Sequence, residues 1–204
     1  MVVKEKQIDY YKAFLADSGD YMLLLLETSA DLNIDDVITV ADNYASYDFL
    51  VCAKRKDFIY YCVPKILSDL IKVIFDKSFK QDTSLKAIVD ALNSNSLYRV
   101  VNDFSVLNFT FAGDGRQFLG FCRMQYGLSY YLSKDAVILY KDLEELEVKR
   151  HRITIFDHDL IDINLSVRAF DFINDKRISK IFHYSNKNYS QVMFVEQNIC
   201  FNRG

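Results

Sequence analysis

Tryptophan is absent from this 204-residue sequence, and proline and glycine are scarce, with one and six residues respectively. Internal repeats, low-complexity tracts and coiled-coil heptads are also missing. In contrast, the chain has 14 tyrosines and 16 phenylalanines, and 50% of its residues are hydrophobic. This composition excludes a disordered chain, because it supplies enough apolar surface for a substantial core. The length suffices for one large domain or two small ones.

The four cysteines form neither a metal-binding nor a disulfide pattern. They are scattered along the chain, without a C-x-x-C pair or a histidine at ligand spacing. A disulfide framework is typical of a smaller, secreted protein, so we expect these thiols to stay reduced. Most of them lie in apolar, strand-like segments, where a free cysteine packs as a small hydrophobe. We therefore predict a structural role for Cys52, Cys62, Cys122 and Cys200.

An excess of positive charge is missing as well. The formal net charge of −3 and the pI of about 5.6 argue against a nucleic-acid partner, since nucleic-acid binding normally needs a basic surface. The longest purely apolar run, residues 21–26, is too short to span a bilayer, and the charged N-terminus does not resemble a secretory signal. We therefore expect no membrane segment, and a location in the cytoplasm of a bacterium or, if the protein is viral, of its host cell.

Hydrophobic periodicity predicts alternating helices and strands in the first half of the chain. Strands are expected over residues 21–27, 49–54 and 58–63, the last two joined by a charged turn. Apolar residues at helical spacing predict helices over residues 4–16, over residues 35–44, directly after Pro64, and over residues 85–92.

A period of two begins near residue 97 and predicts an antiparallel meander. Gly113 and Gly115 can supply the positive φ angles of a tight turn, so residues 106–111 and 117–124 are expected to form a hairpin. These glycines lack the spacing of a phosphate-binding loop, and no cofactor is predicted. Further strands are expected over residues 128–132, 136–140, 146–156, 160–167 and 191–196, with a helical turn near residues 169–176.

These elements predict an α+β fold. A helix/strand N-terminal subdomain, residues 1–95, is expected to pack on a C-terminal antiparallel β-meander, residues 96–204. The polar segment at residues 93–96 marks the boundary, but it is too short to act as a flexible linker. We therefore expect two intimately packed subdomains, which could equally form one domain.

One candidate metal site is an acidic cluster in a predicted turn. Its carboxylates and imidazole could bind a divalent ion, although aspartate is also a common turn residue because its side chain caps its own backbone. The cluster consists of Asp157, His158, Asp159 and Asp162.

A second candidate is the segment Glu147-Val148-Lys149, with Asp135 upstream. It is similar to the D…E-x-K pattern of the restriction-endonuclease-like nucleases, in which two carboxylates hold Mg²⁺ and a lysine orients the attacking water. This resemblance implies a metal-dependent phosphodiesterase or nuclease. That family uses mostly parallel strands, however, whereas this region is expected to form a meander.

Basic and aromatic residues favour a protein interface instead. Residues 149–152 are the strongest basic run and could bind an acidic surface, although the side chains of a strand alternate between its faces. The adjacent tyrosines at positions 60–61 and 130–131 must point to opposite faces of a strand, so one ring of each pair faces outward. Tyrosine is enriched at binding interfaces. The predicted interface residues are Tyr61, Tyr131, Lys149, Arg150 and Arg152.

No motif is specific enough to assign a reaction. We therefore expect a non-enzymatic protein-interaction module with a protein partner or a homodimeric state, such as an inhibitor, an immunity factor or a viral or phage accessory protein. Two alternatives stay open at this point. One is the metal-dependent phosphodiesterase or nuclease, and the other is a structural subunit of a larger assembly, such as a virion component.

Overall fold

The computed structural model describes residues 2–4, 10–41, 45–55, 58–92, 97–151, 165–186 and 190–196. Antiparallel sheet dominates these residues and is joined by three α-helices, so the fold is mixed α+β with β-structure predominant. The backbone divides into two compact units. Unit 1 comprises Met1–Val63 and Val148–Gly204, and unit 2 comprises Pro64–Glu147. The boundary predicted at residues 95 and 96 lies inside unit 2.

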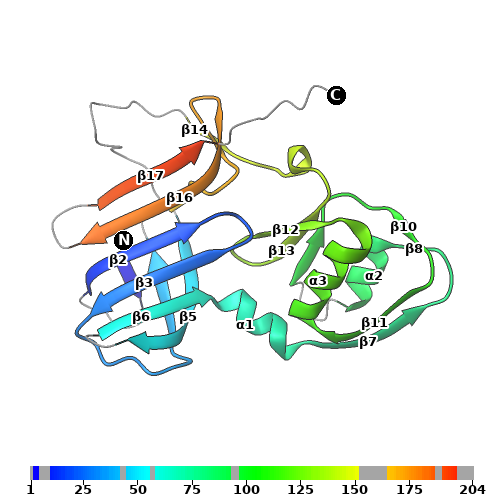
Figure 1. Cartoon of the computed structure of the whole chain (residues 1–204), viewed down its shortest axis with the longest axis horizontal. Helices are drawn as coiled ribbons and strands as arrows, with labels where there is room; N and C mark the ends of the chain where they lie inside the picture. Colours follow the sequence, from blue (N-terminus) through cyan, green and yellow to red (C-terminus); the bar gives the residue numbers. More distant parts are fainter. Residues whose placement is uncertain are drawn as a thin grey trace. The chain divides into compact units, whose positions relative to one another are not determined.

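Unit 1 contains a ten-stranded sheet, visible in Figure 1 as the adjacent arrows of β6, β3, β2, β16 and β17 and the strands beside them. Its described pairings are antiparallel except the short pairing of β14 with β15. In spatial order the strands are β1 (Val2–Lys4), β4 (Val37–Ala41), β5 (Ser46–Arg55), β6 (Ile59–Pro64), β3 (Met22–Thr28), β2 (Tyr10–Asp17), β16 (Lys176–Asn186), β15 (Phe172–Ile173) and β14 (Arg150–His151), with β17 (Ser190–Glu196) also paired to β16.

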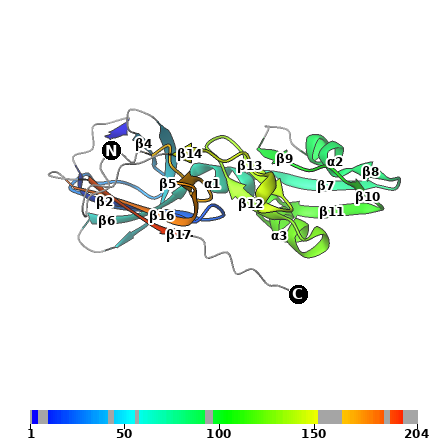
Figure 2. The same cartoon turned by 90° about the horizontal axis from the view of Figure 1, so that it is seen from above.

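The sheet of unit 1 curls around its own core. Figure 2 shows β4 and β5 turned over β2 and β6, and the side chains between them are buried in one cluster. Burial alternates strictly along β3, where every second residue points into this core. The largest contributors are Leu15, Leu24, Leu26, Phe49 and Tyr60.

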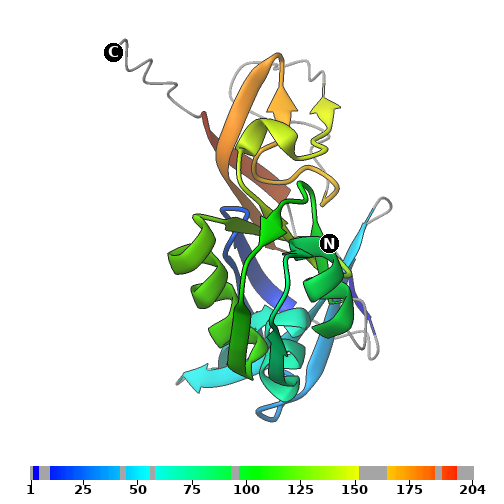
Figure 3. The same ribbon diagram turned by 90° about the vertical axis from the view of Figure 1, so that its right-hand side faces the viewer.

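The described residues of unit 2 form three small sheets and three α-helices, coloured from cyan through green to yellow-green in Figure 3. Aromatic rings fill its core, and Phe118 makes edge-to-face contacts with Phe75, Tyr98 and Phe111 at centroid distances of 5.4–5.6 Å. Its elements are α1 (Lys65–Lys72), β7 (Ile74–Phe79), β8 (Thr83–Ser84), α2 (Leu85–Leu92), β9 (Tyr98–Val100), β10 (Ser105–Val106), β11 (Phe109–Asp114), α3 (Gly115–Tyr126), β12 (Ser129–Leu132), β13 (Val137–Tyr140) and a 3-10 helix at Leu143–Glu145.

Many of the predicted elements are confirmed. The helix after Pro64 is α1, and α2 has the predicted bounds, with the Ser84 side chain accepting a hydrogen bond from the Ala87 amide at 3.1 Å. Strands β5 and β6 are neighbours in the sheet, as the predicted hairpin requires, while residues 56 and 57 of its turn lie outside the described residues. The other confirmed strands are β3, β12, β13 and β17.

The hairpin predicted around Gly113 and Gly115 is wrong. Residues 117–124 belong to helix α3, and Asp114 is its N-cap. The Asp114 carboxylate accepts a hydrogen bond from the Gln117 amide at 2.8 Å, and the Gln117 side chain accepts one from the Asp114 amide at 2.9 Å. This reciprocal capping box satisfies two amides at the helix start. Strand β11 pairs with β7 instead of with a return strand.

The helices predicted over residues 4–16 and 35–44 are also wrong where the structure describes them. Residues 10–17 form β2, in which Ala13 and Leu15 are buried at every second position. Residues 37–41 form β4, whose run of β-branched side chains favours a strand. In β2 both faces carry apolar residues, and some of these residues then fall at the spacing of a helix by chance.

The predicted C-terminal meander, residues 96–204, does not form a separate sheet. Strand β16 falls where no strand was predicted, and it pairs with β2 from the N-terminal half. A register shift between Ile178 and Lys180 interrupts its alternation. Residues 172–173 form β15 where a helical turn was predicted. Within the strand predicted over residues 146–156, the described residues form only β14. Within the strand predicted over residues 160–167, residues 165–167 form no strand. Residues 152–164, which belong to these two predictions, lie outside the described residues.

The capping box predicts a measurable contribution to stability. Asp114→Ala should lower the free energy of unfolding by about 1 kcal/mol, because it removes the acceptor for the first free amides of α3. Urea unfolding followed by circular dichroism measures this loss. Asp114→Asn keeps an acceptor at the same place and should lose no more than a few tenths of a kcal/mol. Equal losses in the two variants would contradict the capping role.

The described cysteines predict a labelling order. Cys62 and Cys122 are buried, and burial raises the pKa of each thiol to about 12, whereas Cys52 is exposed. Since the thiolate is the reactive form, iodoacetamide at pH 8 should alkylate Cys52 long before the two buried thiols. Peptide mapping by mass spectrometry measures the three rates. Alkylation of Cys62 or Cys122 in the folded protein as fast as Cys52 would refute this order.

Candidate protein-binding surface

The central strands of unit 1 are apolar on both faces. One face lines the buried core, and the other carries half-buried or exposed side chains that the core does not use. We call this second surface the outer face. It consists of Phe14 and Ala16 on β2, Leu23 and Leu25 on β3, Tyr61 on β6, Phe182 and Tyr184 on β16, and Met193 and Val195 on β17.

Strand register aligns the outer face in rows, because directly paired residues point to the same side of a sheet. In one row, Tyr184 pairs with Phe14, Phe14 with Leu25, and Leu25 with Tyr61. The next row along the strands contains Met193, Phe182, Ala16 and Leu23.

Aromatic stacking orders the middle of the outer face. The rings of Phe14 and Phe182 stack with centroids 5.8 Å apart and planes 19° from parallel. Near the edge strand, Met193 and Val195 are 46% and 47% exposed. Within the described part of the chain, the outer-face residues are not among the partly buried side chains packed on the three core clusters. Their apolar surface therefore adds little to the core that folds unit 1.

The outer face departs from the usual pattern of an antiparallel sheet. Such a sheet normally alternates apolar residues toward the core with polar residues toward water. Here the polar residues lie around the margin: Lys12 forms an ion pair with Glu27 at 3.3 Å, Lys180 pairs in register with Val195, and Gln191 on the edge strand pairs with Tyr184. A contiguous apolar patch with a polar rim is typical of a protein–protein interface.

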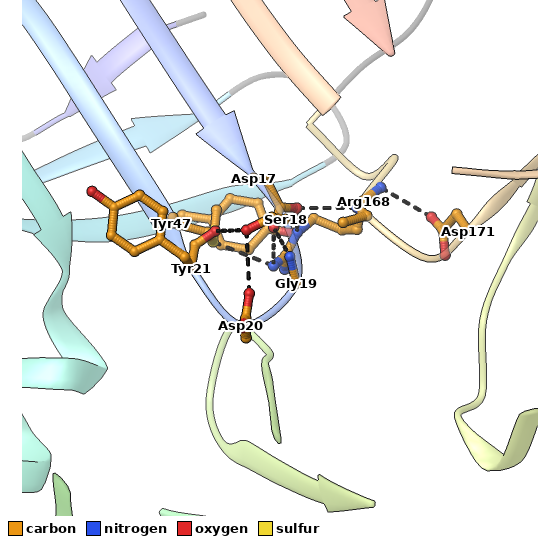
Figure 4. A network of polar contacts seen from close by, with 10 residues as sticks. Asp17, Ser18, Gly19, Asp20, Tyr21, Tyr47, Arg168 and Asp171 are labelled. Atoms are coloured by element: carbon orange, nitrogen blue, oxygen red, sulfur yellow. Dashed lines mark hydrogen bonds and ion pairs between the residues drawn. The ribbon is translucent and has the colours of Figure 1, made fainter. Parts of the chain in front are cut away.

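A buried ion pair fixes the end of β2 (Figure 4). The Asp17 carboxylate accepts hydrogen bonds from Nε of Arg168 at 2.5 Å and from Nη2 of Arg168 at 3.4 Å. The same carboxylate accepts from the Gly19 amide at 2.8 Å and the Ala169 amide at 3.2 Å. Both side chains are almost completely buried. These bonds satisfy the buried charges, as a buried ion pair requires.

The same network extends to the segment that precedes β15. The Asp171 carboxylate accepts hydrogen bonds from the Arg168 amide at 3.0 Å and the Lys149 amide at 2.9 Å. The Arg168 guanidinium also lies over the Tyr47 ring, 5.1 Å from its centroid. Residues 165–171 are thereby bound to β2, β5 and the start of β14. This network has the geometry of a structural element, since its carboxylates accept hydrogen bonds from its guanidinium and backbone amides.

A second cationic cluster surrounds Phe172. Arg150, Phe172 and Arg177 pair in register across β14, β15 and β16. The guanidinium carbons of Arg150 and Arg177 lie 4.3 Å and 4.9 Å from the ring centroid, within the range of a cation–π interaction. Arg150 also approaches Asp175 at 3.6 Å while staying mostly exposed.

The predicted interface residues lie on different elements. Tyr61 lies on the outer face, and Tyr131 lies on β12 in unit 2. Lys149 and Arg150 are adjacent at the other end of the sheet, where β3, β2, β16 and β15 separate them from Tyr61 on β6. Arg152 lies outside the described residues.

The structure describes only part of the candidate metal-binding residues. Asp157, His158, Asp159 and Asp162 lie outside the described residues. Elsewhere, no three histidine, cysteine, aspartate or glutamate side chains of the described segments gather closely enough to hold a metal ion. The backbone amide of Lys149, from the D…E-x-K-like segment, donates a hydrogen bond to the Asp171 carboxylate.

Sequence reasoning missed most of the outer face. It identified Tyr61 but not Phe14, Leu25, Phe182 or Tyr184. A usable signal was present in the run Leu23–Leu26, because consecutive leucines in a strand must place apolar side chains on both faces. The long-range pairing of β2 with β16, which brings the other rings beside these leucines, gives no such local signal.

Comparison with known proteins identifies the fold. No protein-family profile and no curated protein sequence matches this chain. A solved structure of the 43 kDa tail protein of prophage MuSo2 from Shewanella oneidensis has 9% sequence identity to the chain, covers 97% of it and 96% of its own length, and gives a TM-score of 0.62. This likeness shows a shared fold.

Two further solved structures are more distant in fold. The prophage tail protein gp18 from Listeria monocytogenes is 10% identical, matches 74% of this chain and 49% of its own, and gives a TM-score of 0.49. The tail protein from Neisseria meningitidis is also 10% identical, with coverages of 76% and 56% and a TM-score of 0.49. This chain thus spans about half the length of these two proteins. Among the described residues, no helix has the length and apolarity needed to cross a membrane.

The buried ion pair predicts a large stability effect. Asp17→Ala should lower the free energy of unfolding by about 3 kcal/mol or more, because it leaves the buried guanidinium of Arg168 without its carboxylate. The exposed pair of Lys176 with Glu196, at 2.9 Å, provides a control. Glu196→Ala should cost no more than about 1 kcal/mol. Chemical unfolding measures both, and similar small losses would show that Asp17 is not a structural anchor.

Proposed function

We propose that this chain is a non-enzymatic structural or accessory subunit of a phage-tail-like assembly, which it joins by binding other proteins. The observation that carries this proposal is the outer face, an apolar surface made by strands whose opposite side already forms the core. Covering such a face removes apolar area from water, which stabilises association by about 25 cal/mol per Å² before the costs of binding. A partner protein can cover a surface of this kind.

The fold supports the choice of assembly. The solved structure that matches nearly the whole chain is described as a prophage tail protein, and this proposal extends that description to a chain with the same fold. Before assembly, such a subunit would reside in the cytoplasm of the bacterial cell that produces it. We favour this role over an inhibitor or an immunity factor, for which the described residues offer no specific feature.

The proposal predicts that the chain sediments with tail particles. Particles purified from cells that express the encoding genome should contain it, as measured by quantitative mass spectrometry of gradient fractions. Phe182→Lys should shift the protein to the soluble fraction, because it places a charge in the middle of the outer face. Leu107→Lys, at a residue of unit 2 that is 68% exposed, should leave it in the particles. A wild-type protein found only in the soluble fraction would overturn the proposed function.

A further inference from the structure

The ten-stranded sheet of unit 1 has one long edge that its sequence leaves unprotected. Strand β17 pairs with β16 on the side away from β2, and no described strand pairs with its other edge (Figure 1). An open edge is a template for another chain, and proteins normally keep such edges short or charged. The edge strands β1 and β14 follow this rule, with three residues ending in Lys4 and two residues beginning with Arg150. In contrast, β17 has seven residues, and its only charged residue is Glu196 at its end.

The backbone of β17 directs hydrogen-bonding groups outward at alternate residues. In an antiparallel strand, the amide and carbonyl of one residue point to one side and those of the next residue to the other. The Val195 carbonyl accepts a hydrogen bond from the Ser179 hydroxyl of β16 at 3.0 Å, so Val195 faces β16. Val192, Phe194 and Glu196 therefore direct their amides and carbonyls away from the sheet. An extended strand matches groups at this spacing, as in β-strand addition.

The sequence of β17 is complementary to itself in the antiparallel direction. When two copies pair with Met193 opposite Met193, Val192 of each copy lies opposite Phe194 of the other. Both of these residues have outward backbone groups, so the register allows about eight backbone hydrogen bonds over residues 190–196. A β-branched residue opposite an aromatic one is also a favourable cross-strand pair. The same strand thus supplies both halves of a matched pairing.

Charge and exposure agree with this register. Glu196 lies opposite Ser190 of the other copy, so no two like charges face each other. The Glu196 carboxylate already pairs with Lys176 of its own chain at 2.9 Å and needs no partner from outside. Met193 and Val195 are 46% and 47% exposed in the single chain. Pairing along β17 places the same strand of the second copy beside these two side chains and shields them from water.

We propose that β17 pairs with the β17 strand of a second copy of this chain, antiparallel about a twofold axis at Met193. The two sheets then join edge to edge, and the interface is isologous because the same strand serves both copies. Val192 and Phe194 belong to a small apolar cluster on the other side of the sheet from Met193, and the pairing joins the two copies of this cluster. This inference concerns the edge of the sheet instead of the outer face, and it goes beyond the proposed function.

The test is a charge exchange at the twofold axis. Size-exclusion chromatography with light scattering of the full chain, over a roughly hundredfold dilution series, should show twice the monomer mass of 23.8 kDa at the high concentration. Met193→Lys and Met193→Glu should each raise Kd by roughly tenfold or more, because each places two like charges opposite one another. An equimolar mixture of the two variants should restore the dimer, since opposite charges then face each other. Met124→Lys, at a methionine of α3 that is 79% exposed, should leave Kd unchanged.

A second measurement needs no variant. Hydrogen exchange of wild-type β17, followed by mass spectrometry, should be slower at the high concentration than at the low one, because pairing protects the outward amides. Exchange that does not depend on concentration would overturn the proposal even if the variants at Met193 failed to fold, which thermal unfolding shows.

The outcomes separate this proposal from the proposed function. A dimer that returns only when the two folded Met193 variants are mixed supports the pairing. Three results overturn it: a wild-type chain that is monomeric throughout or forms another oligomer, a dimer that both variants leave intact, or folded variants that stay monomeric when mixed. None of these results removes the proposed function if the wild-type chain still sediments with tail particles. Conversely, a dimer that is absent from particles removes the proposed function and leaves the pairing intact.

Discussion

The structure of unit 1 depends on the antiparallel pairing of β2 with β16. This contact joins residues near the two ends of the chain, and the Asp17–Arg168 ion pair fixes it across 151 positions of sequence. Closing so long a loop costs entropy, but that cost rises only slowly with loop length. Unit 2 lies within this loop and forms its own aromatic core. Without the pairing, Phe14 would not stack on Phe182, and the outer face would not exist.

Local sequence patterns predict correctly the helices and strands that have a single buried face or a clear boundary. Helix α2 has one apolar stripe and a serine cap, and β12 and β13 form a hairpin between nearby residues. Strand β2 was mistaken for a helix because Phe14 and Leu15 are both apolar, which hides the period of two. Helix α3 was mistaken for a return strand because the glycines around Asp114 imitate a turn. The capping box between Asp114 and Gln117 is the signal that decides this case.

The candidate surface was less predictable than the fold. Tyr61 could be identified because adjacent tyrosines in a strand must face opposite ways, and Tyr60 is indeed buried while Tyr61 is not. The rings beside it come from β2 and β16, whose register includes a shift that no local pattern reveals. The charge of Arg150 predicts an interface residue, and its guanidinium also packs on Phe172. Charge and aromatic content alone do not separate an interface from a structural stack.

The central claim is that another protein covers the outer face. Hydroxyl-radical footprinting of the chain, alone at high dilution and within purified particles, tests this claim at single residues. The account predicts strong protection of Phe182, Tyr184 and Met193 in the particles relative to the dilute chain. Equal oxidation of these three residues in the two states would show that the outer face stays open to water and would contradict the account.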